Sequence, residues 1–266
     1  MKILNIRMIK PVLHYFNLAD EVVSFGTTRH GGVSKGKLAT LNINPHRGDE
    51  PSAVAENLQA VAAEIGVQAD KVIRLHQIHE THCLTVTDAF LNLSAAEQYE
   101  MEEGKDAVVT DCRNVCIGVH TADCVPVLFY DPVHHAIGAA HAGWRGTVQR
   151  IAQHTLRKMT ELYGTDPKEL KAVVGPCISL KNFEVGQEVY DAFSAAGFPM
   201  ERIARMYEKW HINLPLCNQL QLEELGVPAA NILQSGICTY DNASDFFSAR
   251  ILKEGFGTIY TGIALK

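Results

Sequence analysis

Histidine and cysteine side chains gather in the middle of this 266-residue chain. Six of the 12 histidines and four of the 7 cysteines lie between positions 76 and 135, and His141 follows shortly afterwards. Imidazole nitrogens and thiolates bind transition metals, and they also act as bases and nucleophiles. This clustering is the first indication of where the chemistry takes place.

Three short segments carry the candidate groups. The segment 75–82 (LHQIHETH) has three histidines spaced by three, which neither a strand nor a helix presents on one line, so we expect one of them to face a site. The segment 121–127 (TADCVPV) places Cys124 between an aspartate and an apolar strand. The segment 140–146 (AHAGWRG) ends a strand at His141, just before a glycine turn.

Two imidazoles and one thiolate form a ligand set that suits zinc. His79, Cys124 and His141 would supply three ligands and leave the fourth position open, as in catalytic zinc sites. Cys124 and His141 are 17 positions apart, which places them at the ends of neighbouring strands joined by a short return. The spacing also fits a packed cysteine and a hydrogen-bonded histidine without a metal. A zincin-type protease is disfavoured, because the HExxH pattern is missing.

The turn at 143–146 is a candidate anion site. Backbone N–H groups at the start of the helix expected after it, together with the guanidinium of Arg145, suit phosphate. The alternative is an ordinary strand-to-helix turn in which Trp144 packs and Arg145 is solvated.

Hydrophobic periodicity predicts a mixed fold. We expect helices at 53–66, from 148 to 164, at 185–195 and at 213–225, and strands at 106–110, 115–121, 127–130, 136–142, 171–175 and 257–264. Several strands follow one another before the second helix, so strict alternation of strand and helix fails. The pattern predicts an α+β fold with layered mixed β-sheets flanked by helices, in a single domain spanning 1–266.

Composition narrows the partners. Hydrophobic residues make up 47%, which is typical of a globular protein, and the formal charge of −6 with a pI near 6.0 disfavours nucleic acid. The sequence has no apolar run long enough to span a bilayer and no signal-peptide pattern at its N-terminus. We therefore expect a cytoplasmic protein that acts on a small molecule, with no membrane contact.

The motifs together resemble the laccase-domain proteins, once described as multicopper polyphenol oxidases and now as purine nucleoside phosphorylases. The resemblance covers nearly the whole chain, and TADC followed by HAGWRG is its most specific part. The other matching segments are 28–34 (TRHGGVS), 41–42, 48–49, 77–79, 106–107, 175–176, 183–186 (FEVG), 238–240 (CTY) and 246–250 (FFSAR).

The resemblance implies a metal and an activity. His79, Cys124 and His141 would bind one ion, generally zinc, as the matching residues do in the family. The implied reactions are phosphorolysis of adenosine, inosine, guanosine and methylthioadenosine, and deamination of adenosine. Some members are also described as editing peptidoglycan precursors. Family members commonly have glycine after the first ligand histidine, whereas this chain has Glu80, which we expect to alter the rim of the pocket.

The older oxidase description can be tested on the residues. A multinuclear copper centre needs paired HxH motifs, and this sequence contains none. Three ligands cannot build such a centre, although a single open site of two histidines and a cysteine could take Cu²⁺ in vitro.

Phosphorolysis and deamination also need residues that move protons and bind phosphate or ribose. Asp106 and Asp123 are the expected proton shuttles, and Asp123 could instead orient a ligand histidine. Arg145 is the expected phosphate ligand. The remaining candidates for ribose or phosphate each have a plain alternative as a surface ion pair or a turn cap: Arg29, Arg250, Asn42 and His46.

Two further functions remain open at this point. Cys124 could act as a nucleophile with His141 as its base, giving an amide hydrolase for peptidoglycan precursors. Alternatively, the three ligands could hold a structural zinc in a binding module without enzymatic activity. The sequence gives no expectation for the oligomeric state.

Overall fold

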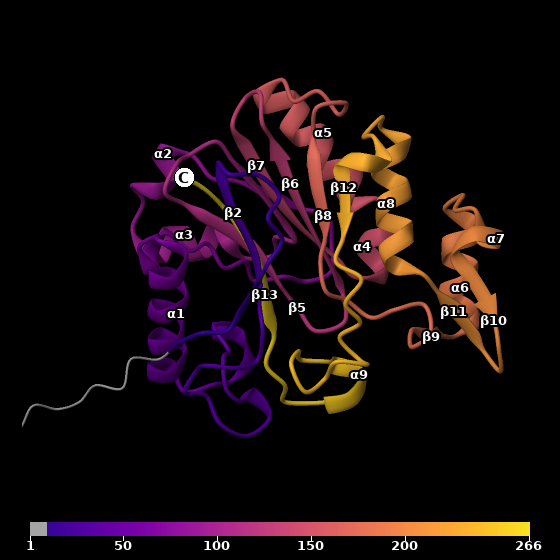
Figure 1. Ribbon diagram of the computed structural model, residues 1–266, viewed down its shortest axis with the longest axis horizontal. Helices are drawn as coiled ribbons and strands as arrows, with labels where there is room; N and C mark the ends of the chain where they lie inside the picture. Colours follow the sequence, from indigo (N-terminus) through magenta and orange to yellow (C-terminus); the bar gives the residue numbers. More distant parts are fainter. Residues whose placement is uncertain (1–9) are drawn as a thin grey trace, which may run out of the picture.

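The computed structural model describes residues 10–266, whose elements stack in four layers (Figure 1). A four-stranded sheet and a six-stranded sheet face each other across a shared apolar core. Helix α1 (Pro51–Ile65) covers the outer face of the first sheet, and α5 (Ile151–Tyr163) and α8 (Leu214–Glu224) cover the outer face of the second. The predicted α+β class with layered sheets flanked by helices is confirmed.

The six-stranded sheet is mixed. Its outer pairs, β12 with β8 and β3 with β4, are parallel, whereas its inner pairs are antiparallel. The strands in order are β12 (Ile232–Gln234), β8 (Lys171–Val174), β6 (Val125–Asp131), β7 (Ala136–Ala142), β4 (Ala107–Thr110) and β3 (Cys83–Thr85).

The four-stranded sheet is antiparallel throughout. Its strands in order are β1 (Leu13–Tyr15), β2 (Val22–Thr27), β13 (Ile259–Leu265) and β5 (Cys116–Thr121). Side chains on β5 alternate between two cores, because successive residues of a strand point to opposite faces. Ile117 and Val119 pack against the six-stranded sheet, whereas Cys116 packs beneath α1.

The remaining elements are short. A three-stranded sheet lies beside α6 and α7 at one end of the molecule (Figure 1). These and the other short elements are α2 (Asp88–Leu91), α3 (Ala95–Glu102), α4 (Trp144–Val148), α6 (Gln187–Ala195), α7 (Met200–Ile203), α9 (Ala249–Leu252), β9 (Glu184–Val185), β10 (Ala204–Met206) and β11 (Trp210–Ile212). Within residues 10–266, no helix has both the length and the apolar character needed to cross a membrane.

One predicted helix is present but begins later than expected. The apolar periodicity from 148 to 164 suggested one helix after Gly146, but the chain forms α4 from Trp144 and then α5, with a break at Arg150. Arg150 has a left-handed φ of 65°, and its guanidinium donates to Ala196 O and Glu224. Periodicity missed this break because Val148 and Ile151 keep helical spacing across it.

The chain crosses from one sheet to the other between β5 and β6. Residues 122–124 make this crossing, and His141 at the end of β7 lies beside it because Pro126 of β6 pairs with His141. Residues from both sheets therefore meet at one point of the fold.

Candidate functional site

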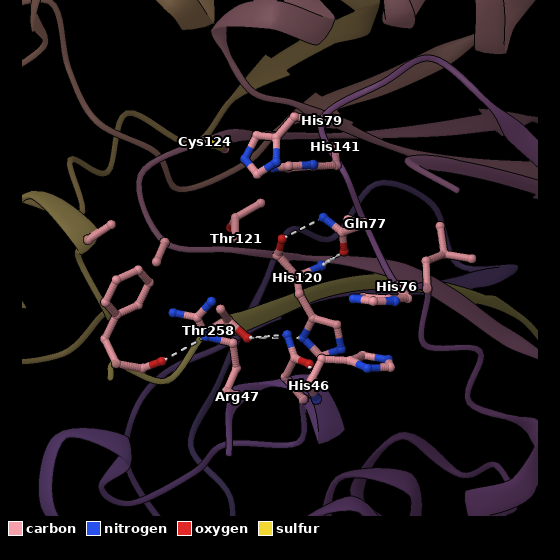
Figure 2. Close-up of a pocket in the computed structure, with 15 residues that line it drawn as sticks. His46, Arg47, His76, Gln77, His79, His120, Thr121, Cys124, His141 and Thr258 are labelled. Carbon is pink, nitrogen blue, oxygen red and sulfur yellow. Dashed lines mark hydrogen bonds between the residues drawn. The ribbon is translucent and has the colours of Figure 1, made fainter. Parts of the chain in front are cut away.

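The side chains of His79, Cys124 and His141 converge at this crossing (Figure 2). Their ligand atoms all lie within 4.8 Å of one another, and residues 10–266 contain no second group of this kind. His141 lies on β7, Cys124 directly precedes β6, and His79 comes from the loop before β3. The predicted return between neighbouring strands is confirmed, since β6 and β7 are an antiparallel pair.

Asp106 holds two of these three residues in place. Its Oδ1 accepts hydrogen bonds from Nδ1 of His141 at 2.7 Å and from the backbone N–H of His79 at 3.0 Å. Its Oδ2 accepts the N–H groups of Ile78 and Glu80, both at 3.0 Å. This clamp stabilises a loop in which His79 has a left-handed φ of 67°. It also leaves Nε2 of His141 to face Cys124.

The donor set fits a zinc ion. Two imidazoles and a thiolate are zinc ligands, and a carboxylate bonded to the far nitrogen of a ligand histidine is the usual outer partner. The backbone leaves room beside them at Gly143, where a Cβ would lie 3.0 Å from Cδ2 of His79 and 3.1 Å from Sγ of Cys124. A side chain at this position would crowd the ligands.

Charges stabilise one another within the group. Burial raises the pKa of the Cys124 thiol. The charge of His141 and hydrogen bonds with both histidines lower this pKa by more than burial raises it, so that the net value is about 6. Burial lowers the pKa of His141, but Cys124 and Asp106 raise it, to about 9. Burial raises the pKa of Asp106, but its bonds to His141 and to the backbone lower it overall. Without a metal, the group favours a thiolate beside an imidazolium.

The three residues form one end of a cavity of about 260 Å³ (Figure 2). Its wall includes five histidines and an arginine but no aspartate or glutamate. The lining residues are Asn44, His46, Arg47, Leu75, His76, Gln77, His79, His120, Thr121, Ala122, Cys124, His141, Ala249, Phe256 and Thr258. The cavity therefore suits a neutral or anionic ligand.

A chain of hydrogen bonds orients His120 in the wall. The side-chain oxygen of Asn44 accepts the N–H of His46, so its amide nitrogen faces Thr258 Oγ1 at 3.2 Å. The Thr258 hydroxyl in turn lies 3.2 Å from Nδ1 of His120. Burial, followed by the charge of Arg74, lowers the pKa of His120 well below its usual value, so the ring is neutral.

Arg47 and His46 reach the cavity from the short turn Pro45–Arg47. Arg47 donates from Nε to Phe256 O at 3.0 Å, and its guanidinium lies 4.3 Å from the centre of the Phe256 ring. His46 stacks on His76 with ring centres 4.1 Å apart. Burial, followed by the charge of His76, lowers the pKa of His46.

Asp123 does not face the cavity, so the shuttle role predicted for it finds no support. Its carboxylate accepts from Thr239 Oγ1 at 2.6 Å, from Ser248 Oγ at 3.0 Å and from the N–H of Arg250 at 2.7 Å. It thereby holds the segment 239–250 against the crossing. The alternative role of orienting a ligand histidine belongs to Asp106 instead. Asp106 is fully buried, and all four of its hydrogen bonds go to the loop and to His141.

Four other predicted ligands also lie outside the cavity wall. Asn42 is fully buried and bonds Asp49 and the Asn44 backbone, which is the turn-capping alternative. Arg29 donates to the carbonyls of Ala39 and Ala243. Arg250 donates to Glu184 O. Arg145 is exposed, and its guanidinium carbon lies 4.4 Å from the centre of the Trp144 ring. This agrees with the alternative of an ordinary turn in which Arg145 is solvated.

The histidine-rich loop at 75–82 brings more histidines to the cavity than we expected. Two of its three histidines, His76 and His79, line the cavity, whereas we predicted one. The loop is irregular and turns sharply at His79, so spacing rules for strands and helices do not apply to it. Glu80 is exposed and is absent from the cavity wall, so its expected effect on the rim finds no support.

Sequence reasoning missed Arg47, His120 and Gln77. Gln77 Nε2 donates to His120 O at 2.8 Å, and its Oε1 accepts the His120 N–H at 2.7 Å. The only signal for Arg47 was its position next to His46, between the matching segments 41–42 and 48–49. His120 sits within a fully buried strand and looks like a packing residue in the sequence.

Comparison with known proteins identifies the family of this chain. Residues 23–266 match the family described as multi-copper polyphenol oxidoreductase laccase. The chain belongs to this family. Its predicted membership is therefore confirmed.

Relatives within the family are named as enzymes. A purine nucleoside phosphorylase from Bacteroides thetaiotaomicron is 41% identical over 261 residues, covering 96% of this chain and 97% of the relative. Adenosine deaminase RL5, from an unknown prokaryotic organism, is 35% identical over 257 residues, covering 96% and 98%. The crystal structure of YlmD from Geobacillus stearothermophilus superposes with a TM-score of 0.88 at 28% identity, covering 97% and 99%. These names support an enzyme rather than a binding module.

Proposed function

We propose that this chain is a zinc-dependent purine nucleoside phosphorylase that also deaminates adenosine. The observation that carries the proposal is the group of His79, Cys124 and His141 at the end of a cavity without carboxylates. The names of the relatives support both activities. By family resemblance, we propose adenosine, inosine, guanosine and methylthioadenosine as substrates, with phosphate as the second substrate.

The two reactions place different demands on the cavity. In phosphorolysis a phosphate oxygen bonds to the sugar carbon C1′, and the purine leaves with the electron pair of the broken C–N bond. In deamination a water oxygen bonds to C6 of adenosine, and the amino group leaves as ammonia. His79, Cys124 and His141 would hold the zinc ion, which would supply a Lewis acid for this chemistry. The protein itself orients the reactants and moves protons.

Proton transfer falls to imidazoles in this mechanism. Asp106 and Asp123, the expected shuttles, already use both carboxylate oxygens to accept hydrogen bonds from other parts of the chain. His46 and His76 line the cavity, and the lowered pKa of His46 keeps it neutral and able to accept a proton near neutral pH. We propose these two rings as the proton carriers.

The test is to follow both products from one nucleoside. The zinc-loaded protein is incubated with adenosine, with and without phosphate, and adenine and inosine are separated by chromatography. We expect adenine only with phosphate, inosine without it, and the loss of both in Cys124→Ala. Cys112→Ala is the matched control, because Cys112 is also partly exposed but lies outside the cavity. The absence of both products from the metal-loaded protein would contradict the proposal.

A cysteine hydrolase is the second candidate, and one observation favours it. The lowered pKa of Cys124 beside His141 is the arrangement of an activated nucleophile with its base. This reading leaves His79 without a role. Stoichiometric zinc in the purified protein, together with protection of Cys124 from alkylation by nucleosides, would exclude it. Alkylation that destroys amide hydrolysis in a metal-free protein would support it.

A further inference from the structure

His76 in the cavity wall is fastened to the segment 102–104, which lies outside that wall. The N–H of His76 donates to Glu102 O at 3.2 Å, and the carbonyl of His76 accepts the N–H of Gly104 at 3.0 Å. His76 and Glu103 themselves form a parallel bridge. The backbone therefore holds the side chains of His76 and Glu103 next to each other.

The Glu103 carboxylate is bonded to one edge of the His76 ring. Its Oε2 lies 2.5 Å from Nδ1 of His76. A carboxylate only accepts hydrogen bonds, so Nδ1 carries a proton and donates it to Glu103. Nε2 is then the one ring nitrogen of His76 that remains to exchange a proton with a ligand. The carboxylate therefore decides which nitrogen of His76 takes part in proton transfer.

His46 fixes the plane of the same ring. The rings of His46 and His76 stack with their centres 4.1 Å apart and their planes 13° apart. A half-turn flip of the His76 ring would exchange Nδ1 with a carbon and break the bond to Glu103. Figure 2 shows both rings on the side of the cavity away from His79 and Cys124. Ring N–H groups lie in the ring plane, so stacked rings do not pass a proton to each other directly, and each serves a ligand separately.

The bond between His76 and Glu103 matters more for the reaction than for the fold. The two side chains retain 37% and 49% of their accessible surface. Exposed pairs of this kind contribute only about 0–1 kcal/mol to stability. A positioned proton carrier, in contrast, contributes roughly 100- to 10,000-fold to a reaction rate. A third group that orients the base is a recurring part of such sites.

We propose that Glu103 is a positioning residue, which orients His76 so that its Nε2 exchanges protons with the substrate. The inference rests on the proposed function, because it assigns a role within that reaction. In phosphorolysis, the purine that leaves with the electron pair of the broken bond takes up one proton. The doubly protonated ring of His76 gives this proton from Nε2, keeps the proton on Nδ1 against Glu103, and regains one from water.

The test combines kinetics with the tautomer of His76 in the zinc-loaded protein. Heteronuclear NMR of isotope-labelled histidine shows at alkaline pH which ring nitrogen carries the proton, and His76→Gln assigns the signal. We expect the Nδ1–H form in the unchanged protein and more of the Nε2–H form in Glu103→Ala. The kcat for release of adenine from adenosine should fall about tenfold in Glu103→Ala. The KM should change little, because Glu103 does not line the cavity.

Two further variants show whether the bond itself is responsible. Glu103→Gln keeps an oxygen that accepts from Nδ1, so its kcat should lie between those of Glu103→Ala and the unchanged protein. Glu100→Ala is the matched control, because Glu100 is an exposed glutamate of α3 whose side chain has no hydrogen bond or ion pair with residues 10–266. It should leave both the tautomer and kcat unchanged.

A double-mutant cycle separates action through His76 from a general effect. Glu103→Ala should not lower kcat further in the His76→Gln background. Full kcat or an unchanged tautomer in folded Glu103→Ala would overturn the proposal, and so would losses that multiply in the double variant. A tautomer that depends on Glu103, in a protein that releases no adenine, would contradict phosphorolysis and support the orientation of the ring by Glu103. Melting temperatures confirm that each variant is folded.

Discussion

Asp106 accepts a hydrogen bond from Nδ1 of His141 at 2.7 Å, and both side chains are buried. The same carboxylate accepts three consecutive backbone N–H groups of the loop that carries His79. One residue thus positions two proposed ligands that are 62 positions apart in the sequence. The relationship explains how an irregular loop can contribute to a metal site.

Asp106→Asn should weaken zinc binding. The amide cannot accept all four hydrogen bonds, so His141 and the loop lose their fixed orientation, and we expect about a 10- to 100-fold loss of zinc affinity. Competition with a chromogenic chelator measures it. Asp131→Asn is the matched control, because Asp131 also accepts Nδ1 of a histidine, His134, but away from the cavity. Equal zinc affinity in both variants would contradict the positioning role.

Gly143→Ala should disturb the ligands without preventing folding. Gly143 has a φ of −63°, which alanine adopts freely, but the added Cβ would lie within about 3 Å of His79 and Cys124. We expect weaker zinc binding and an unfolding temperature close to that of the unchanged metal-free protein. Gly26→Ala is the control, since its Cβ meets no atom closer than 3.5 Å. Full zinc affinity in Gly143→Ala would show that the space is not needed.

The metal-free protein should react with iodoacetamide at Cys124 down to about pH 6. The pKa of this thiol is lowered to about 6, so its thiolate is lost only below that pH. The thiolate contributes stability that is lost as pH falls through 6, whereas the raised pKa of His141 makes its contribution disappear as pH rises through about 9. Stability from this pair should therefore be greatest between those values. Mass spectrometry across pH measures the alkylation, with Cys124→Ser as the blank.

Thr258→Val should destabilise the fold more than Thr261→Val. Thr258 links Asn44 to His120, and its loss leaves two buried groups without partners, at about 1–3 kcal/mol of unfolding free energy. Thr261 is buried nearby, but its hydroxyl has no partner among the described residues, so its removal should cost little. Urea unfolding compares them, and equal costs would argue against the chain of bonds that orients His120.

Much of the fold could be predicted from local pattern. The longer buried strands β4 to β8 and β13 and the helices α1, α6 and α8 end within two residues of the predicted bounds, because each carries enough residues to show a period. Strands β9 to β12 span only two or three residues and show none. The break at Arg150 was missed because periodicity records side-chain faces and not backbone angles.

The sequence by itself determined which residues could carry metal chemistry, since residue type and motif pointed to His79, Cys124 and His141 before any fold was known. Only the tertiary structure decided which other residues position these three side chains and line the cavity beside them. Asp106 turned out to hold the ligands, Asp123 to hold a distant segment, and Arg47 rather than Arg145 to reach the cavity. The physical reason is that a side chain's role depends on where its hydrogen bonds go, and those partners lie up to 209 positions away in the sequence.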